Sequence, residues 1–155
     1  MTSLPKIALE WRRFQDMSTE ELYELLQFRQ NIFVMEQRSV YPDLDGLDQS
    51  ARHLLLRVES ELCGYLRLIP VPASPPSVRI GRVAVDLRLR RRGLGHMLMD
   101  EALRLHSEDY AGQEIVLSAQ VHLAAFYAAF GFQETSAPYD EFGILHIDMK
   151  LSART

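Results

Sequence analysis

RLRRRGLGHMLMDEAL, residues 88–103, places four arginines and two glycines directly before an apolar helical pattern. The spacing of the apolar residues predicts a helix from Gly93 to His106. The preceding segment VRIGRVAVD, Val78 to Asp86, is typical of a strand. A strand that enters a glycine-containing turn before a helix is suited to bind phosphate. The first N–H groups of the helix lack intrahelical partners, the helix dipole adds positive potential, and a missing Cβ lets a diphosphate approach.

Three interpretations of this basic run compete: a phosphate cradle, a nucleic-acid patch and a solvated helix start. The run lacks the third glycine of a dinucleotide-binding fingerprint, and the chain contains no Gly-Lys-Ser/Thr sequence of a P-loop. The formal net charge of −4 argues against a general polyanion binder, because such binding comes mostly from Lys and Arg that neutralise phosphates. We therefore expect no nucleic-acid partner. The competing hypothesis is a nucleic-acid binder that uses Arg88–Arg92.

The overall composition indicates one globular domain over residues 1–155, because 155 residues that are 47% hydrophobic can form a single core. The single cysteine, Cys63, excludes an internal disulfide. No stretch approaches eighteen consecutive apolar residues, and the first residues carry no long apolar run, so we expect neither a membrane partner nor secretion. The five histidines show no metal-ligand spacing, so we expect no metal. The sequence thus predicts a cytoplasmic protein.

The pattern outside residues 88–103 alternates between strands and helices. A helix is expected from Thr19 to about Met35, with Ser18 or Thr19 as its N-cap, and a short helix from Leu123 to Phe130. The acidic segment YPDLDGLD, Tyr41–Asp48, is interpreted as a solvated turn, and the alternative is that its carboxylates attract a cationic amine. The fold class is therefore α+β, a sheet flanked by helices. The strands are expected at residues 7–14, 53–58, 62–71, 78–86, 114–119 and 143–151.

The motif Arg90-x-x-Gly93-x-Gly95 after RVAVD resembles the pyrophosphate-binding motif of the Gcn5-related N-acetyltransferases, the GNAT family. QVHLAAFYAAFGF, Gln120–Phe132, is similar to the family element Asn-x-x-Ala-x-x-x-Tyr-x-x-x-Gly-Phe, with Gln in place of the Asn and Leu in place of the first Ala. Segments such as LQFRQNIFVMEQ, RHLLL and GILHIDM are similar to the ElaA-type branch, so the resemblance covers nearly the whole chain. It implies an α/β/α layered fold with a mixed, mostly antiparallel central sheet.

The resemblance implies an acyl-CoA-dependent N-acyltransferase that moves an acetyl group from acetyl-CoA directly to an amine. Backbone N–H groups of Val83–Val85 would polarise the thioester carbonyl, and Tyr127 would protonate the departing sulfur. The acceptor would be a small-molecule or peptide amine, and the resemblance is compatible with a homodimer. The implied coenzyme-binding residues are Val83, Ala84, Val85, Arg90, Arg91, Arg92, Gly93, Leu94, Gly95, His96 and Gln120.

The base that deprotonates the amine is not fixed by the sequence. Many family members carry a Glu on the strand before the loop, whereas this strand offers Arg79 and Arg82. An ideal helix would place His122 about 140° from Tyr127, on another face. Because the strand carboxylate is missing and Gln120 replaces the Asn, the alternative function is a coenzyme A-binding sensor without turnover. The candidates for base or acceptor binding are Glu36, Asp45, His122 and His146.

Overall fold

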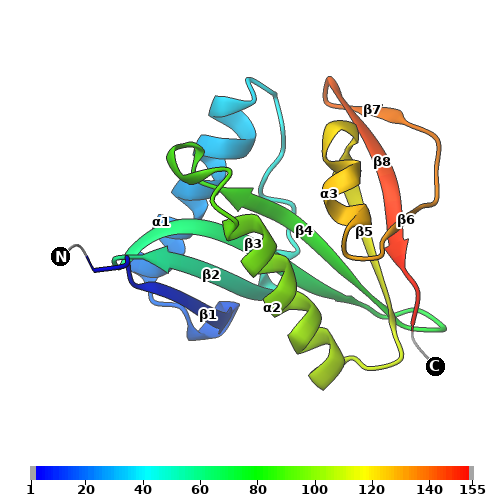
Figure 1. The fold of residues 1–155 in the computed structure, drawn as a ribbon, viewed down its shortest axis with the longest axis horizontal. Helices are drawn as coiled ribbons and strands as arrows, with labels where there is room; N and C mark the ends of the chain where they lie inside the picture. Colours follow the sequence, from blue (N-terminus) through cyan, green and yellow to red (C-terminus); the bar gives the residue numbers. More distant parts are fainter. Residues whose placement is uncertain (1–2, 154–155) are drawn as a thin grey trace.

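The computed structural model describes residues 3–153, in which one mixed sheet forms the centre of the molecule (Figure 1). The strand order is β1-β2-β3-β4-β5-β8-β6, and β7 also pairs with β8. Only β4 and β5 pair in parallel among these neighbours, so the prediction of a mostly antiparallel sheet is confirmed. The strands are β1 (Ile7–Arg13), β2 (Arg52–Val58), β3 (Glu61–Val71), β4 (Ser77–Val85), β5 (Glu114–Gln120), β6 (Gln133–Glu134), β7 (Tyr139–Glu141) and β8 (Ile144–Leu151).

Helices cover both faces of this sheet. On β2, Leu54 and Leu56 belong to the core that packs against α2, whereas Leu55 belongs to the core beneath α1. Because successive strand residues point to opposite faces, the two helices lie on opposite sides, and the layered arrangement is confirmed. The helices are α1 (Thr19–Gln30), which continues as a π-helix over Asn31–Glu36, then α2 (Leu94–Asp109) and α3 (Ala124–Ala128).

The sheet opens between β4 and β5. These strands pair only from Ser77–Arg79 to Glu114–Val116, and they diverge toward their carboxyl ends (Figure 1). The pairing of β4 with β3 also shifts register there, between Tyr65 and Arg67, and Arg82 adopts a left-handed φ of 54°. This β-bulge bends β4 away from β5. The edge of β4 that faces the opening has no strand partner beyond Arg79.

Several sequence expectations need correction. The first helix is regular only to Gln30 before the π-helix. The two short strands β6 and β7 were not predicted, because two or three residues are too few to show an alternating pattern. The interpretation of Tyr41–Asp48 as a solvated turn is wrong for Asp43 and Asp48, which are each only 7% exposed, whereas Leu44 and Leu47 are exposed. None of the helices in residues 3–153 has the length and apolar character needed to cross a membrane.

Candidate active site

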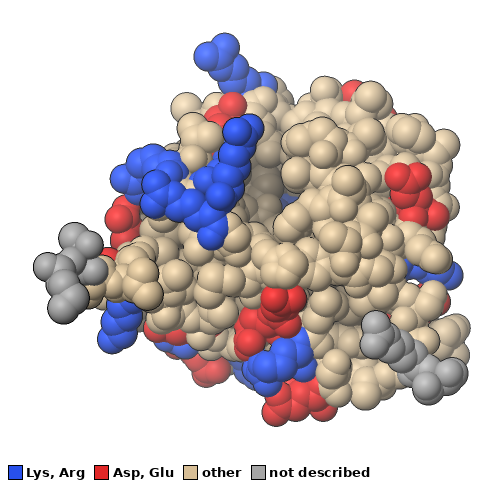
Figure 2. Space-filling model, in the orientation of Figure 1, with Lys and Arg blue, Asp and Glu red and all other residues tan. Residues whose placement is uncertain are grey.

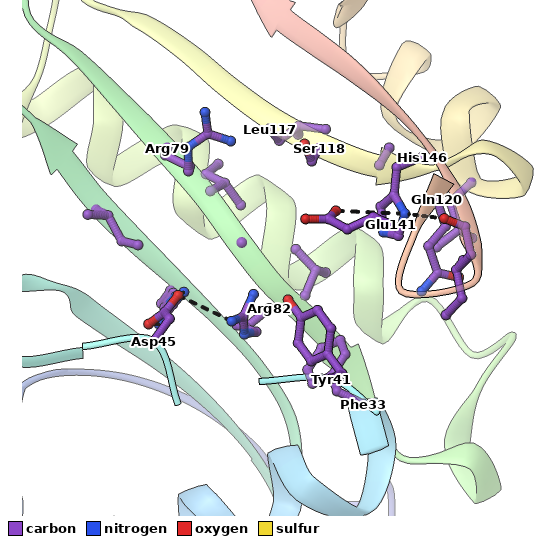
Figure 3. A pocket seen from close by; sticks show the side chains of 18 of the residues that line it. Phe33, Tyr41, Asp45, Arg79, Arg82, Leu117, Ser118, Gln120, Glu141 and His146 are labelled. Carbon is purple, nitrogen blue, oxygen red and sulfur yellow. Dashed lines mark hydrogen bonds and ion pairs between the residues drawn. The ribbon is translucent and has the colours of Figure 1, made fainter. Parts of the chain in front are cut away.

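Two cavities occupy the opening between β4 and β5. The first, which we call the entry cavity, has a volume of about 680 Å³ and is lined by the end of β4, the loop before α2 and the start of α2. The second, the inner cavity, is smaller, about 230 Å³, and lies over β3, β4, β5 and β8 (Figure 3). Figure 2 shows Lys and Arg side chains gathered over the loop before α2, beside a hollow in the surface. The residues that line both cavities, and so mark where they meet, are Phe33, Gln37, Val83, Gln120, Leu123 and Tyr127.

The start of α2 offers free backbone donors to the entry cavity. Gly93 is the N-cap residue with φ 79°, a left-handed conformation that glycine adopts without steric cost. The first helical hydrogen bond runs from the Met97 amide to the Gly93 carbonyl, at 3.1 Å. Within the described chain, the amides of Gly93, Leu94, Gly95 and His96 donate to no protein acceptor. Four N–H groups at the positive end of a sixteen-residue helix therefore face an anion-sized opening.

The arginines before α2 are not equivalent. Arg90 donates from Nε to the Val85 carbonyl at 3.0 Å and pairs with both carboxylate oxygens of Glu36, one at 2.9 Å. Arg91 lines the entry cavity and makes no ion pair among residues 3–153. Arg92 is exposed and does not line this cavity. The other residues of the predicted coenzyme-binding set, Val83–Val85, Gly93–His96 and Gln120, line it.

Tyr127 lies at the junction of the two cavities and is 6% exposed. Edge-on contacts with Phe126 and Phe132, at ring-centroid distances of 5.0 and 6.2 Å, fix the ring. Its hydroxyl has no hydrogen-bond partner in the part of the chain that the structure describes. Burial raises the pKa of this phenol, so the hydroxyl stays protonated at neutral pH. A protonated donor without a protein partner is therefore placed where the cavities join.

The base candidates divide between the two cavities. His122 precedes α3 in a short 3-10 turn, so the helical angle used to separate it from Tyr127 does not apply, and both side chains line the entry cavity. Glu36 also lines the entry cavity, where Arg90 occupies its carboxylate. His146 lines the inner cavity, with Nδ1 2.8 Å from the Ile144 carbonyl and 3.8 Å from a Glu141 oxygen. Asp45 lines the inner cavity as well.

A buried ion network supports the wall of the inner cavity. Arg29 of α1 is fully buried and donates from Nε to Asp43 Oδ2 at 3.1 Å and from Nη1 to Asp48 Oδ1 at 2.7 Å. Arg67 of β3 donates to the same Asp48 oxygen at 2.9 Å and to both oxygens of Asp45. Against the desolvation that would raise both values, Arg29 and Arg67 hold the pKa of Asp48 below its usual value, and Arg67, with the Leu47 amide, lowers that of Asp45 to about 2.

Arg82, the bulge residue of β4, completes the network. It donates from Nε to Asp43 Oδ1 at 2.9 Å and from Nη2 to Asp45 Oδ2 at 3.2 Å, and its guanidinium lies 4.8 Å from the centre of the Tyr41 ring. The three arginines and three aspartates balance in charge. Two of the carboxylates of the acidic segment, Asp43 and Asp48, are therefore buried, and the carboxylate of Asp45 is engaged by protein.

Several lining residues were not singled out from the sequence. Phe33 lies in the π-helix that continues α1 and Gln37 follows its end, so the spacing of a regular helix does not place them at the cavities. Arg67, Ser118 and Glu141 reach the inner cavity from three different strands, and nothing in their spacing shows this. Among residues 3–153, no group of three or more His, Cys, Asp or Glu side chains could hold a metal ion.

Comparison with known proteins agrees with this geometry. Residues 14–153 match a family model described as an acetyltransferase (GNAT) domain. The chain belongs to this family. The ElaA protein of Escherichia coli strain K12 is 37% identical over 145 residues, which are 91% of this chain and 95% of that protein. A UPF0039 protein of Synechocystis is 38% identical over 145 residues, 93% of this chain and 94% of that protein.

Solved structures of related GNAT proteins have the same fold. The crystal structure of E. coli ElaA superposes with a TM-score of 0.88 at 35% identity, over 94% of this chain and 99% of that one. An acyl-CoA N-acyltransferase from Pseudomonas aeruginosa gives a TM-score of 0.88 at 37% identity with the same coverage. The resemblance to the ElaA-type branch and the expected fold class are confirmed, and membership supports an acyltransferase of the GNAT type.

Proposed function

We propose that this GNAT protein transfers an acetyl group from acetyl-CoA to an amine in one direct step. The observation that carries the proposal is the meeting of the two cavities at Tyr127, inside the opening of the sheet. One cavity has anion-binding groups at its mouth, and the other is lined by ionisable side chains. Two substrates that enter from opposite sides would react where the cavities join, and holding them together supplies much of the rate.

The entry cavity would take the coenzyme. Its diphosphate would accept hydrogen bonds from the amides of Gly93–His96, and Arg91 would add charge beside it. The pantetheine arm would lie along the unpaired edge of β4, at Val83–Val85. Backbone N–H groups at that edge would polarise the thioester carbonyl, and they need no reorganisation during the reaction.

The proposed step forms one bond and breaks one. The neutral amine attacks the thioester carbon, the new C–N bond forms, and the C–S bond breaks. The departing sulfur takes the proton of Tyr127, and the acylated nitrogen gives one of its protons to the phenolate, which restores the phenol. A buried phenol of raised pKa is a suitable acid because it is fully protonated at neutral pH.

For the base, the geometry favours His146 among the candidates. It is the one histidine or glutamate of the set that lines the inner cavity, from which the amine would arrive, whereas His122 and Glu36 line the entry cavity. With Nδ1 beside the Ile144 carbonyl, the neutral ring carries its lone pair on Nε2. That nitrogen would accept the proton lost by the amine.

Turnover by the wild-type protein and its Tyr127→Phe variant tests the proposal. We expect acetyl-CoA to raise the melting temperature of both, because a ligand that binds only the folded state stabilises it. With an accepted amine, Tyr127→Phe should lower kcat by about 10²-fold without a matching rise in the KM for acetyl-CoA. Unchanged kcat would assign the proton transfer to another group. Binding without thiol release across a broad amine panel would favour the sensor alternative.

A further inference from the structure

The inner cavity is lined by ionisable side chains of both signs, and only some of them are paired within the protein. Arg67, Arg79 and Arg82 line it, together with Asp45 and Glu141. Asp45 is fully engaged, because Arg67 takes both of its oxygens and Arg82 takes one of them. The carboxylate of Asp45 is thus not available to a ligand.

Arg79 is the cation of this cavity that lacks a partner. Its side chain is exposed and makes no hydrogen bond or ion pair within residues 3–153. Figure 3 shows its guanidinium directed from β4 toward Leu117 and Ser118 on β5. Asp148 is close enough for Arg79 to help lower its pKa, but its Oδ1 accepts from the hydroxyls of Ser118 and Tyr139. Arg79 therefore presents a full set of donors to the cavity.

A second donor without a partner lies in the wall of the inner cavity. Arg67 is 3% exposed, and its Nε is a buried polar atom without a hydrogen-bond partner among the described residues. A buried donor without an acceptor costs free energy, and such atoms are uncommon in folded proteins. This atom is closed off from the cavity, so a ligand would meet the guanidinium of Arg79 rather than Arg67 Nε.

The opposite end of the cavity suits an amine. His146 pairs with Gln120 across β8 and β5, and Gln120 lies at the junction with the entry cavity. Glu141 lies beside His146, at 3.8 Å, and accepts no other protein hydrogen bond within the described chain. A cationic amine would be attracted there and would lose its proton to His146.

The strand register sets the separation of the two ends. Arg79 lies opposite Val116 and His146 opposite Gln120, four residues or about 13 Å apart along β5, and the Arg79 side chain is directed into this interval. Between them the floor is open, because a Cβ added to Gly81 would meet no atom within 4 Å. A small ligand that carries both a carboxylate and an amine would reach both ends.

We propose that the acceptor is an amine that also carries a carboxylate, the class of free amino acids, with its carboxylate on Arg79 and its amine beside His146 and Glu141. This inference rests on the proposed function, because it describes the second substrate of that reaction. The groups involved are the unpaired guanidinium at one end of the cavity and the carboxylate–histidine pair at the other.

Matched pairs of amines test the proposal. Lysine is compared with cadaverine, and phenylalanine with phenethylamine, by thiol release from acetyl-CoA. We expect the member with the carboxylate to have a kcat/KM at least about tenfold higher, the effect of one or two charged hydrogen bonds. Arg79→Ala should remove this ratio, and Arg79→Lys should restore part of it. The matched control is Arg13→Ala, which removes another exposed, unpaired strand arginine at the far edge of the sheet and should keep the wild-type ratio.

Binding of products separates this inference from the proposed function. N-acetylphenylalanine and N-acetylphenethylamine are titrated calorimetrically into the protein saturated with coenzyme A, which needs no turnover. Tighter binding of N-acetylphenylalanine that depends on Arg79 supports the proposed ligand class, even if no amine releases thiol. An absence of thiol release would contradict only the proposed turnover. Equal turnover and binding within each pair, or faster turnover of cadaverine than of lysine, would overturn the inference.

Discussion

The two cavities that meet at Tyr127 are built in opposite ways. About half of the residues that line the entry cavity come from one continuous segment, Val83–His96, and this segment supplies four backbone amides without a protein acceptor in the described chain. The inner cavity is formed by side chains from several strands and loops, held by an ion network whose members are far apart in the chain. Backbone donors keep their positions when side chains change, whereas a side-chain wall depends on each partner. Substitutions should therefore affect the two cavities differently.

The largest effect is expected from Asp48→Ala in the ion network. Asp48 accepts from Arg29 at 2.7 Å and from Arg67 at 2.9 Å, and both arginines are buried. Removing the carboxylate leaves Arg29 with Asp43 alone and Arg67 with Asp45 alone, so two buried cations lose one of their two carboxylates, which costs up to about 3 to 5 kcal/mol. Urea unfolding measures the loss. Asp109→Ala is the control, because it breaks the ion pair between Arg52 and Asp109, whose side chain is 40% exposed. It should lower the free energy of unfolding by about 1 kcal/mol or less. Equal losses would mean that the network contributes no more than a surface pair.

A large effect on coenzyme binding is expected from Gly95→Val. A Cβ at Gly95 would lie 3.5 Å from Phe126 Cζ and 4.0 Å from Val85 Cγ2, so the two further methyl groups extend into the entry cavity. Overfilling such a space costs about 1 to 3 kcal/mol, which corresponds to a rise of about 10- to 100-fold in the KM for acetyl-CoA. Circular dichroism should show a folded protein. An unchanged KM would mean that the coenzyme does not pass between α2 and β4.

A smaller and complementary effect is expected from Gly81→Val. A Cβ at this position meets no protein atom within 4 Å, so the strand should accept valine without loss of stability. The side chain would occupy the floor of the inner cavity and lower kcat/KM for the acceptor by about tenfold. The KM for acetyl-CoA should stay at the wild-type value. A rise in the acetyl-CoA KM as large as that of Gly95→Val would contradict the division into two cavities.

The same difference explains what could be predicted from sequence. The strand, turn and helix around Arg88–Leu103 are neighbours in the chain, so their residues stay together in the fold and their roles could be read from spacing. The β4–β5 opening follows from a bulge at Arg82, next to Gly81, within the strand that the sequence predicted. Fold class and most element bounds were predictable for this reason.

The inner cavity could not be predicted in this way. Arg29 and Asp48 are 19 residues apart, and Arg67 and Asp45 are 22 apart, and no periodicity connects them. A run of carboxylates usually indicates solvent, and only the arginines from other elements make its burial favourable. The position of His122 also depended on where α3 begins, a boundary that spacing does not fix.

The smallest effect is expected from Arg91→Ala, although its sequence run was the most conspicuous feature of the chain. Arg91 lines the entry cavity without an ion pair within the described chain, so its loss should change the stability by no more than about 0.5 kcal/mol. The KM for acetyl-CoA should rise about two- to fivefold at low salt, and less at high salt, because an exposed charge is screened. Arg88→Ala is the control, since Arg88 pairs with Asp86 and Glu61 and does not line the cavity. Loss of coenzyme binding at every salt concentration would show that the guanidinium, rather than the amides at the start of α2, carries the affinity.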